Sequence, residues 1–223
     1  METYTPTDKT RVTRIPDRGK YDAETVHAIL DAGLVCHAGF VVGEQPYVIP
    51  TLYARVGGDI YFHGSAASRM LRSLSGGVRV CITVTLTDGL VLARAAFHHS
   101  MNYRSVVALG IALPVTDENE KMAAMEMFTN RIVPGRWSDV RLPTQQEMRA
   151  TTVLRLPLEE VSAKIRAGDP KDEAEDYDLP IWAGVIPLQT VAGSPIPDSA
   201  LRMKLEPPKY VMDYLREAGG ESF

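Results

Sequence analysis

From Leu34 onward, the chain is a series of short runs of β-branched and aromatic residues separated by turn signals. This pattern constrains the fold more than any other feature of the sequence, because such spacing is typical of antiparallel strands. Gly57-Gly58 is predicted to be a hairpin turn, and Asp88-Gly89 a second one. The alternation of strand and long helix that a parallel α/β sheet requires is absent. The sequence therefore predicts a mainly β (α+β) fold, an antiparallel barrel of about six strands with peripheral helices.

Helices are predicted only at the margins of this barrel. Asp22 and Asp117 can each cap a helix that begins at the next residue. Two further helices are predicted over residues 65–75 and near the end of the chain, over 208–219. The stretch that contains Pro157 is predicted to be one interrupted strand.

The predicted organisation is one barrel domain with two extensions. Residues 1–21 are polar and rich in proline, threonine and basic residues, which predicts an extended N-terminal arm. The barrel domain spans residues 22–190, and residues 191–223 form a C-terminal tail that carries the short helix.

Composition excludes several classes of function. The 223 residues carry a formal net charge of -4, which argues against nucleic acid or an anionic membrane as the main partner. The start lacks the apolar stretch of a signal peptide, and no run approaches the ~20 apolar residues of a membrane span. Cys36 and Cys81 lie in apolar runs without CxxC spacing, as expected of buried thiols in a reducing compartment. A cytoplasmic protein is expected.

Common catalytic and metal-binding motifs are missing from the sequence. There is no GxGxxG, Walker or GxSxG motif, and none of the five histidines has the spacing of a zinc site. No metal site is predicted.

The most informative stretch is FHGSAASRML, in which a strand that ends at His63 leads directly into a helix. Gly64 lets the backbone turn, and Ser65, Ser68 and Arg69 then offer two hydroxyls and a guanidinium to an anion such as phosphate. The alternative is purely structural, with Ser65 as a helix cap and Arg69 as a solvated surface residue.

Three further segments carry weaker signals. Arg104 and Ser105 are neighbours at the start of an apolar strand, so they point to opposite faces, and one of them can meet a ligand. Pro46 and Pro50 bracket a short strand and would free backbone groups for a heterocycle, although an edge strand explains them equally well. The loop PGRWSDVR places a tryptophan between two arginines. Such a tryptophan can stack on a planar ligand or close an interface, and it can equally be an ordinary core residue.

Together these motifs resemble the pyridoxamine 5′-phosphate oxidase-like superfamily of split β-barrels that bind flavin mononucleotide (FMN). The resemblance covers roughly residues 21–188 and is strongest to the branch of flavin-nucleotide-binding and nitroimidazole-resistance proteins. Its most specific parts are PYVIPTLYAR, DIYFHGSAASRML, VCITVTLTDGLVLARAAFHHSMNYRSVV and PGRWSDVR, followed by SAKIRAG and WAGVIPL. The resemblance implies a six-stranded antiparallel split β-barrel, FMN as cofactor, and a homodimer with FMN at the subunit interface.

The resemblance also implies a role for each matching position. Backbone contacts to the flavin ring are expected from Val48, Ile49, Pro50 and Thr51. The FMN phosphate is expected at His63, Gly64, Ser65, Ser68 and Arg69. The ribityl chain or ring is expected near Arg104 and Ser105. The second subunit is expected to contribute Arg136 and Trp137, and further anion contacts are expected from Lys164 and Arg166.

The implied activity is that of an FMN-dependent oxidoreductase that passes electrons from a reduced nicotinamide or deazaflavin nucleotide to a small planar acceptor. The chain lacks the Arg-rich ending of true pyridoxamine-phosphate oxidases, so vitamin B6 oxidation is not expected. Two alternatives stay open: a flavin carrier or sensor without turnover, and a haem-binding barrel with His63, His98 or His99 as axial ligand. His63 is also open to a role beside the flavin, or to simple packing under the phosphate loop.

Overall fold

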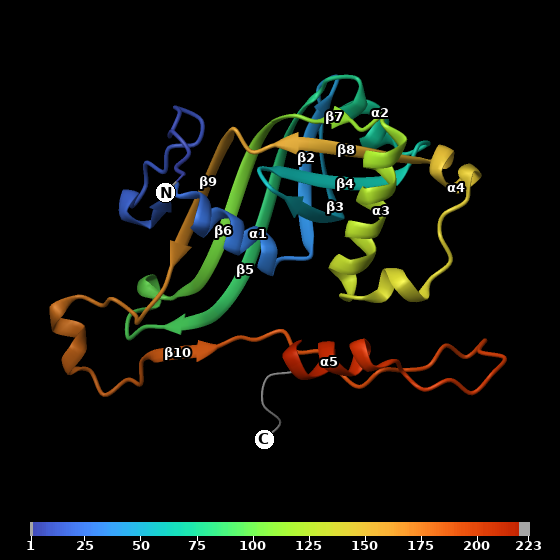
Figure 1. Cartoon of the computed structure of the whole chain (residues 1–223). Coiled ribbons are helices and arrows are strands. Elements are labelled where there is room, and N and C mark those ends of the chain that lie inside the picture. The colour runs from blue at the N-terminus through green and yellow to red at the C-terminus, as the bar shows by residue number, and fades with distance from the viewer. Residues whose placement is uncertain (1, 219–223) are drawn as a thin grey trace.

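The computed structural model describes residues 2–218, which contain ten antiparallel strands. The strands are β1 (Gly19–Lys20), β2 (Val35–Val42), β3 (Gln45–Val56), β4 (Asp59–Ser65), β5 (Arg79–Leu92), β6 (Ser100–Ile111), β7 (Leu113–Pro114), β8 (Thr151–Pro157), β9 (Glu160–Arg166) and β10 (Gly184–Pro187). They form one sheet in the order β1-β9-β6-β5-β2-β3-β4-β8-β7, and β10 pairs with β5 (Figure 1). The fold class was predicted correctly.

The predicted count of six strands is too low. The two-residue pairings β1 and β7 and the late strand β10 add three, and the stretch around Pro157 folds as two strands. The chain turns between Pro157 and Glu160, because β8 pairs with β4 whereas β9 pairs with β6.

The predicted hairpin turn at Asp88-Gly89 is wrong. These residues lie inside β5, where the register against β6 shifts between Thr87 and Gly89, and the chain reverses farther on through the 3₁₀ helix η2 (Ala96–His98). A β-bulge uses the same residue types as a turn, so local sequence does not separate the two. A Cβ at Gly89 would lie 3.0 Å from Val185 Cγ1. The glycine therefore lets β10 approach β5.

Five α-helices surround the sheet. They are α1 (Ala23–Ala32), α2 (Arg69–Ser75), α3 (Glu118–Ile132), α4 (Gln145–Ala150) and α5 (Lys209–Ala218). The predicted caps form, since Asp22 accepts a hydrogen bond from the Thr25 N–H at 2.8 Å and Asp117 from the Glu120 N–H at 2.8 Å. The remaining 3₁₀ helices are η1 (Pro16–Arg18), η3 (Arg136–Asp139) and η4 (Ala174–Asp178).

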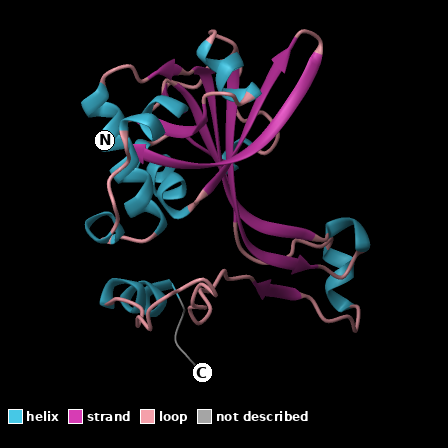
Figure 2. Cartoon of the chain, turned by 90° about the vertical axis from the view of Figure 1, so that its right-hand side faces the viewer, coloured by secondary structure: helices cyan, strands magenta, loops and turns pink. Residues whose placement is uncertain are grey.

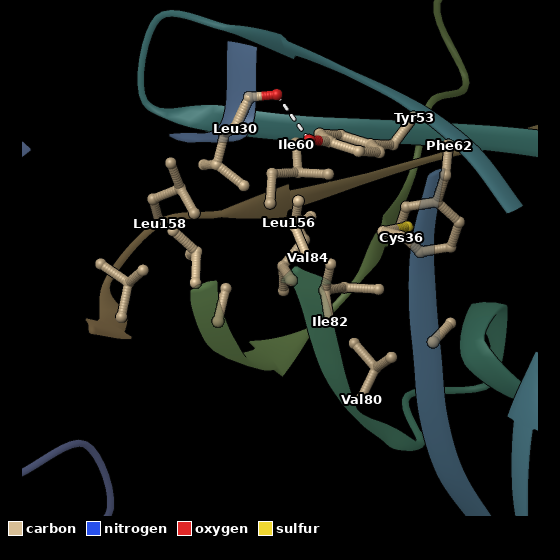
Figure 3. Packing of buried hydrophobic residues seen from close by; sticks show 14 of the residues in the cluster. Leu30, Cys36, Tyr53, Ile60, Phe62, Val80, Ile82, Val84, Leu156 and Leu158 are labelled. Atoms are coloured by element: carbon tan, nitrogen blue, oxygen red, sulfur yellow. Dashed lines mark hydrogen bonds between the residues drawn. The ribbon is translucent and has the colours of Figure 1, made fainter. Parts of the chain in front are cut away.

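The main core lies between α1 and the inner face of the sheet. Leu30 of α1 packs beside Tyr53 and Ile60, and the Tyr53 hydroxyl donates to the Leu30 carbonyl (Figure 3). Cys36 is buried in this core, as predicted, and burial raises the pKa of its thiol to about 12. Such a thiol stays protonated at neutral pH.

A second, smaller core lies on the outer face of β3, β4 and β8, where α3 packs. Phe128 of α3 contacts this face together with Ala54 and Val153. The outer face of β2 and the first half of β3 lies beyond the reach of α3, and Val48 there is 66% exposed. The functional site lies where the covered and uncovered parts meet.

The two ends of the chain differ in how they pack. In the N-terminal segment, η1 leads into β1, which pairs with β9, and the Tyr4 hydroxyl lies 2.9 Å from His27 Nε2. The C-terminal segment runs below the barrel and ends in α5, the predicted terminal helix (Figure 2). Residues 219–223 of the predicted tail lie outside the described residues. Among residues 2–218, no helix combines the length and apolarity needed to cross a membrane.

Candidate functional site

The site is built on the strand β3, which changes its pairing partner partway along. Residues Gln45–Leu52 pair with β2, whereas Tyr53–Val56 pair with β4. Beyond Phe62, β4 pairs with β8 alone and continues to Ser65. The barrel therefore splits here, and among the strands of residues 2–218 none pairs with the other backbone edge of β3 over residues 45–52. This is the part of the chain from which backbone contacts to a heterocycle were predicted.

The loop between β4 and α2 lies next to this open edge. The Arg69 guanidinium carbon is 5.1 Å from the centre of the Tyr47 ring, so α2 and β3 meet at these two side chains. Ser68 is the N-cap of α2, but its hydroxyl makes no capping bond, whereas Ser65 Oγ accepts from the Ala67 N–H at 3.2 Å. Among the side chains of residues 2–216, no carboxylate forms an ion pair with Arg69. An exposed, unpaired arginine beside two serines fits an anion.

His63 precedes this loop and points away from the barrel core, toward α3. Its ring centre lies 4.2 Å from that of Phe128, and its Nδ1 is buried with no hydrogen-bond partner among the described residues. Burial lowers the pKa of His63, so the imidazole is neutral at pH 7. The side chain lines a cavity of about 400 Å³.

Trp137 lines the same cavity from η3, although it is 74 positions farther along the chain. The other walls are mostly apolar, from Leu52, Met125, Phe128, Ile132, Val140 and Met148. Arg141 and Glu147 lie at its border and form an ion pair at 2.8 Å. The apolar pattern of α3 was visible in the sequence, but nothing local indicated that Met125 and Phe128 would face His63.

The structure places the remaining predicted residues elsewhere. Arg104 forms two bonds with Asp88, at 2.7 and 2.9 Å, beside a separate cavity of about 750 Å³. Ser105 faces the opposite side of β6, as expected, and donates to the Lys164 carbonyl at 3.3 Å. Arg136, next to Trp137, donates to the Tyr210 hydroxyl at 2.8 Å. These residues do not converge with the open edge of β3 within one subunit.

Arg166, one of the two weaker anion candidates, is buried, and its guanidinium donates to Asn102 Oδ1 as well as to backbone carbonyls. Its guanidinium donates to the carbonyls of Gly168 at 2.8 Å and Asp169 at 3.0 Å. Its hydrogen bonds thus serve the turn after β9.

The two other candidate haem ligands lie at the far tip of the β5–β6 hairpin. His98 Nε2 is 3.6 Å from Glu173, and His99 Nδ1 is 3.1 Å from the Ala95 carbonyl oxygen. His63 differs from both, because it lines an apolar cavity.

Comparison with known proteins identifies the class to which this fold and site belong. The family model described as pyridoxamine 5′-phosphate oxidase matches residues 22–165, and the chain belongs to this family. The sequence-based resemblance and the split-barrel fold are thereby confirmed. A search of curated proteins found no match.

Solved structures provide more specific relatives. The flavocytochrome Anf3 from Azotobacter vinelandii is 39% identical, with a TM-score of 0.89 over 94% of this chain and 98% of that one. The FAD and heme binding protein from Mycobacterium smegmatis is 31% identical, with a TM-score of 0.84 over 88% and 96%. A protein assigned to 5-nitroimidazole antibiotic resistance from Bacteroides thetaiotaomicron is 21% identical, with a TM-score of 0.53 over 65% and 84%, and shows a shared fold.

Proposed function

We propose that this chain is a flavin-dependent oxidoreductase that works as a cytoplasmic homodimer and binds the FMN moiety of its cofactor where the barrel splits. The observation that carries the proposal is the open edge of β3 beside the exposed, unpaired Arg69. The names of the two relatives that align over almost the whole chain, a flavocytochrome and an FAD and heme binding protein, support a flavin.

The residues present fit the chemistry of the cofactor. Unpaired backbone groups over residues 45–52 suit the polar edge of a flavin ring, which offers both hydrogen-bond donors and acceptors. Arg69 and the Ser68 hydroxyl, neither engaged in an ion pair or cap, suit the phosphate. FMN and FAD share both parts. We propose FMN, and the mass of the bound nucleotide distinguishes the two.

The bound flavin would supply the hydride and electron chemistry itself. The chain then has to bind, orient and shield it. The neutral imidazole of His63 and the apolar walls of its cavity, which include Trp137, would bring a small planar acceptor near the ring and exclude water. A reduced nicotinamide or deazaflavin nucleotide is the proposed donor.

A second subunit is part of the proposal because one face of the site lacks a cover. Val48 is 66% exposed and Pro50 is exposed too, although both are expected to contact the flavin ring. A partner seated on this face would bury the ring, and the interface would include the cofactor.

A second candidate occupant of this cavity is haem, which would be held by His63 and would take the place of the small acceptor. Met125, Met148, Phe128 and Trp137 line the cavity with soft and aromatic groups, and Arg141 at its border suits a carboxylate. The buried Nδ1 that lacks a partner shows that the imidazole is not committed to a structural hydrogen bond. The two relatives that align over most of this chain are named a flavocytochrome and an FAD and heme binding protein, and these names support haem as a candidate.

The test is the absorption spectrum of the purified protein, with each released chromophore identified by mass. A two-banded yellow spectrum with released FMN or FAD is expected, and a Soret band is expected if haem is present. His63→Ala should remove the Soret band and keep the flavin. A colourless protein that fails to take up added flavin would refute the proposal. Oxidation of a nicotinamide nucleotide in the presence of an acceptor separates an oxidoreductase from a carrier.

A further inference from the structure

The segment after β9 has an unusual distribution of apolar side chains. No residue from 167 to 216 is fully buried, yet twelve large apolar residues in this stretch are exposed. Ile196 is 93% exposed, and Trp182 and Met203 are 68% and 69% exposed. We call residues 188–216, with α5 at their end, the C-terminal arm. The arm therefore exposes apolar side chains of the kind that are normally buried, although none of its own residues is buried.

The arm makes few contacts with its own barrel. It starts at β10, which is paired with β5, and is held again at Tyr210, which bonds Arg136 and packs on Gly135. Between these two points it runs below the barrel (Figure 1 and Figure 2). Isolated apolar residues on a surface are ordinary, but a contiguous apolar segment of this size marks an interaction site.

A second uncovered apolar surface lies on the same chain. On the outer face of β2 and β3, Val35 and Val41 are each 50% exposed and Val48 is 66% exposed. The register places all three on the face that points away from the core, because Val48 pairs with Gly39 and Val41 with Pro46. We call this the β2–β3 face. It carries no acidic or basic side chain apart from His37 at its centre.

We propose that the C-terminal arm of one subunit packs on the β2–β3 face of a second copy of this chain. Two complementary surfaces on one chain form a closed, twofold pair when each arm meets the face of the other copy. Seven of the exposed large apolar side chains lie in the arm itself. A stable interface needs roughly 800 Å² per partner, and in a twofold pair each subunit contributes both an arm and a face toward that area. This contact deepens the proposed dimer and is independent of the identity of the cofactor.

The contact would also complete the proposed flavin site. Val48 and Pro50 belong both to the β2–β3 face and to the strand expected beside the ring. The partner's arm would therefore cover the site that a single subunit leaves open, a role expected from sequence for Arg136 and Trp137. Within one subunit, Arg136 bonds its own Tyr210 and Trp137 lines its own cavity.

Photocrosslinking tests the contact directly. Ile196 is replaced by the photocrosslinking residue benzoylphenylalanine. Full-length chain labelled with heavy nitrogen is then mixed with unlabelled chain. A crosslinked peptide pair with one heavy and one light member comes from two copies of the chain, and its mass identifies it. Crosslinks between copies, from residue 196 to residues 35–50, are expected. Val56 is 51% exposed at the β3–β4 turn, and the same probe placed there is the control, for which no such product is expected.

Sedimentation of charged variants provides the second readout. The double variant Ile196→Glu with Leu205→Glu should raise the dimer dissociation constant at least tenfold. A twofold dimer contains the arm contact two times, so each substitution introduces two charges into apolar interfaces. Neither residue is buried within its own subunit, so folding should be unaffected. Val56→Glu is the matched control and should leave the dimer intact.

Two results would overturn the proposal. A dimer that the double variant leaves intact, with crosslinks only within one chain, would refute the arm contact and leave the proposed dimer standing. A wild-type chain that sediments as a monomer would refute both the arm contact and the dimer.

Discussion

Replacing Arg69 by alanine tests the phosphate end of the proposed flavin site. Arg69 is exposed at the start of α2 and has no carboxylate partner among the side chains of residues 2–216, so removing it breaks no ion pair among them. A charged hydrogen bond contributes about 1.5–3 kcal/mol. Because water screens an exposed pair, we take the lower end, ~1.5 kcal/mol, which corresponds to roughly tenfold weaker binding.

The assay is titration of apoprotein with FMN, followed by quenching of flavin fluorescence at two salt concentrations. We expect Arg69→Ala to raise the Kd about tenfold, and added salt to weaken the wild type more than the variant. Arg72→Ala is the matched control, since Arg72 is an exposed arginine of the same helix, and it should bind as the wild type does.

Stability needs a separate measurement, because Arg69 also lies over the Tyr47 ring. The lost cation–π contact should cost only about 0.5–1 kcal/mol at an exposed site, which leaves the protein folded in the titration. If Arg69→Ala bound FMN as tightly as the wild type, Arg69 would not contact the phosphate. Riboflavin, which lacks the phosphate, should bind the wild type and Arg69→Ala equally.

Three further predictions concern the structure around the site. Phe128→Ala should lower the free energy of unfolding by about 3–5 kcal/mol in urea, because this buried ring holds α3 to the sheet; a much smaller loss would mean that α3 is not anchored there. Burial lowers the pKa of His63 in the folded state, so below its ordinary pKa the unfolded chain binds a proton more readily than the folded chain does. Stability should therefore be intact above about pH 6.5 and fall below it, and His63→Phe should flatten that fall in urea midpoints measured from pH 7 to pH 5. In Gly89→Ala, the added Cβ would lie 3.0 Å from Val185 Cγ1, and we expect faster amide hydrogen exchange across β10; unchanged exchange would show that β10 accommodates the methyl group.

Local chemistry made much of this fold readable from the sequence. The helix starts at Asp22 and Asp117 were predicted because helix capping is local. Each carboxylate accepts a hydrogen bond from the N–H three residues later, within the first turn of its own helix. The hairpin at Gly57-Gly58 was predicted for a similar reason, since a turn depends on the residues that form it. The proposed phosphate loop from His63 to Arg69 is likewise one continuous stretch, so its residues could be named together.

Contacts between distant segments decided the rest. Asp88-Gly89 has the residues of a turn, but pairing with β6 and β10 on either side holds it inside β5 as a bulge. The cavity beside His63 needs Trp137, and the position of η3 depends on how α3 packs on the sheet, which no local pattern encodes. Periodicity and capping act over a few residues, so the sequence alone determined the longer strands and the capped helices. Where the barrel splits, and which side chains meet at that split, follows from burial summed over the whole molecule, and only the tertiary structure decides it.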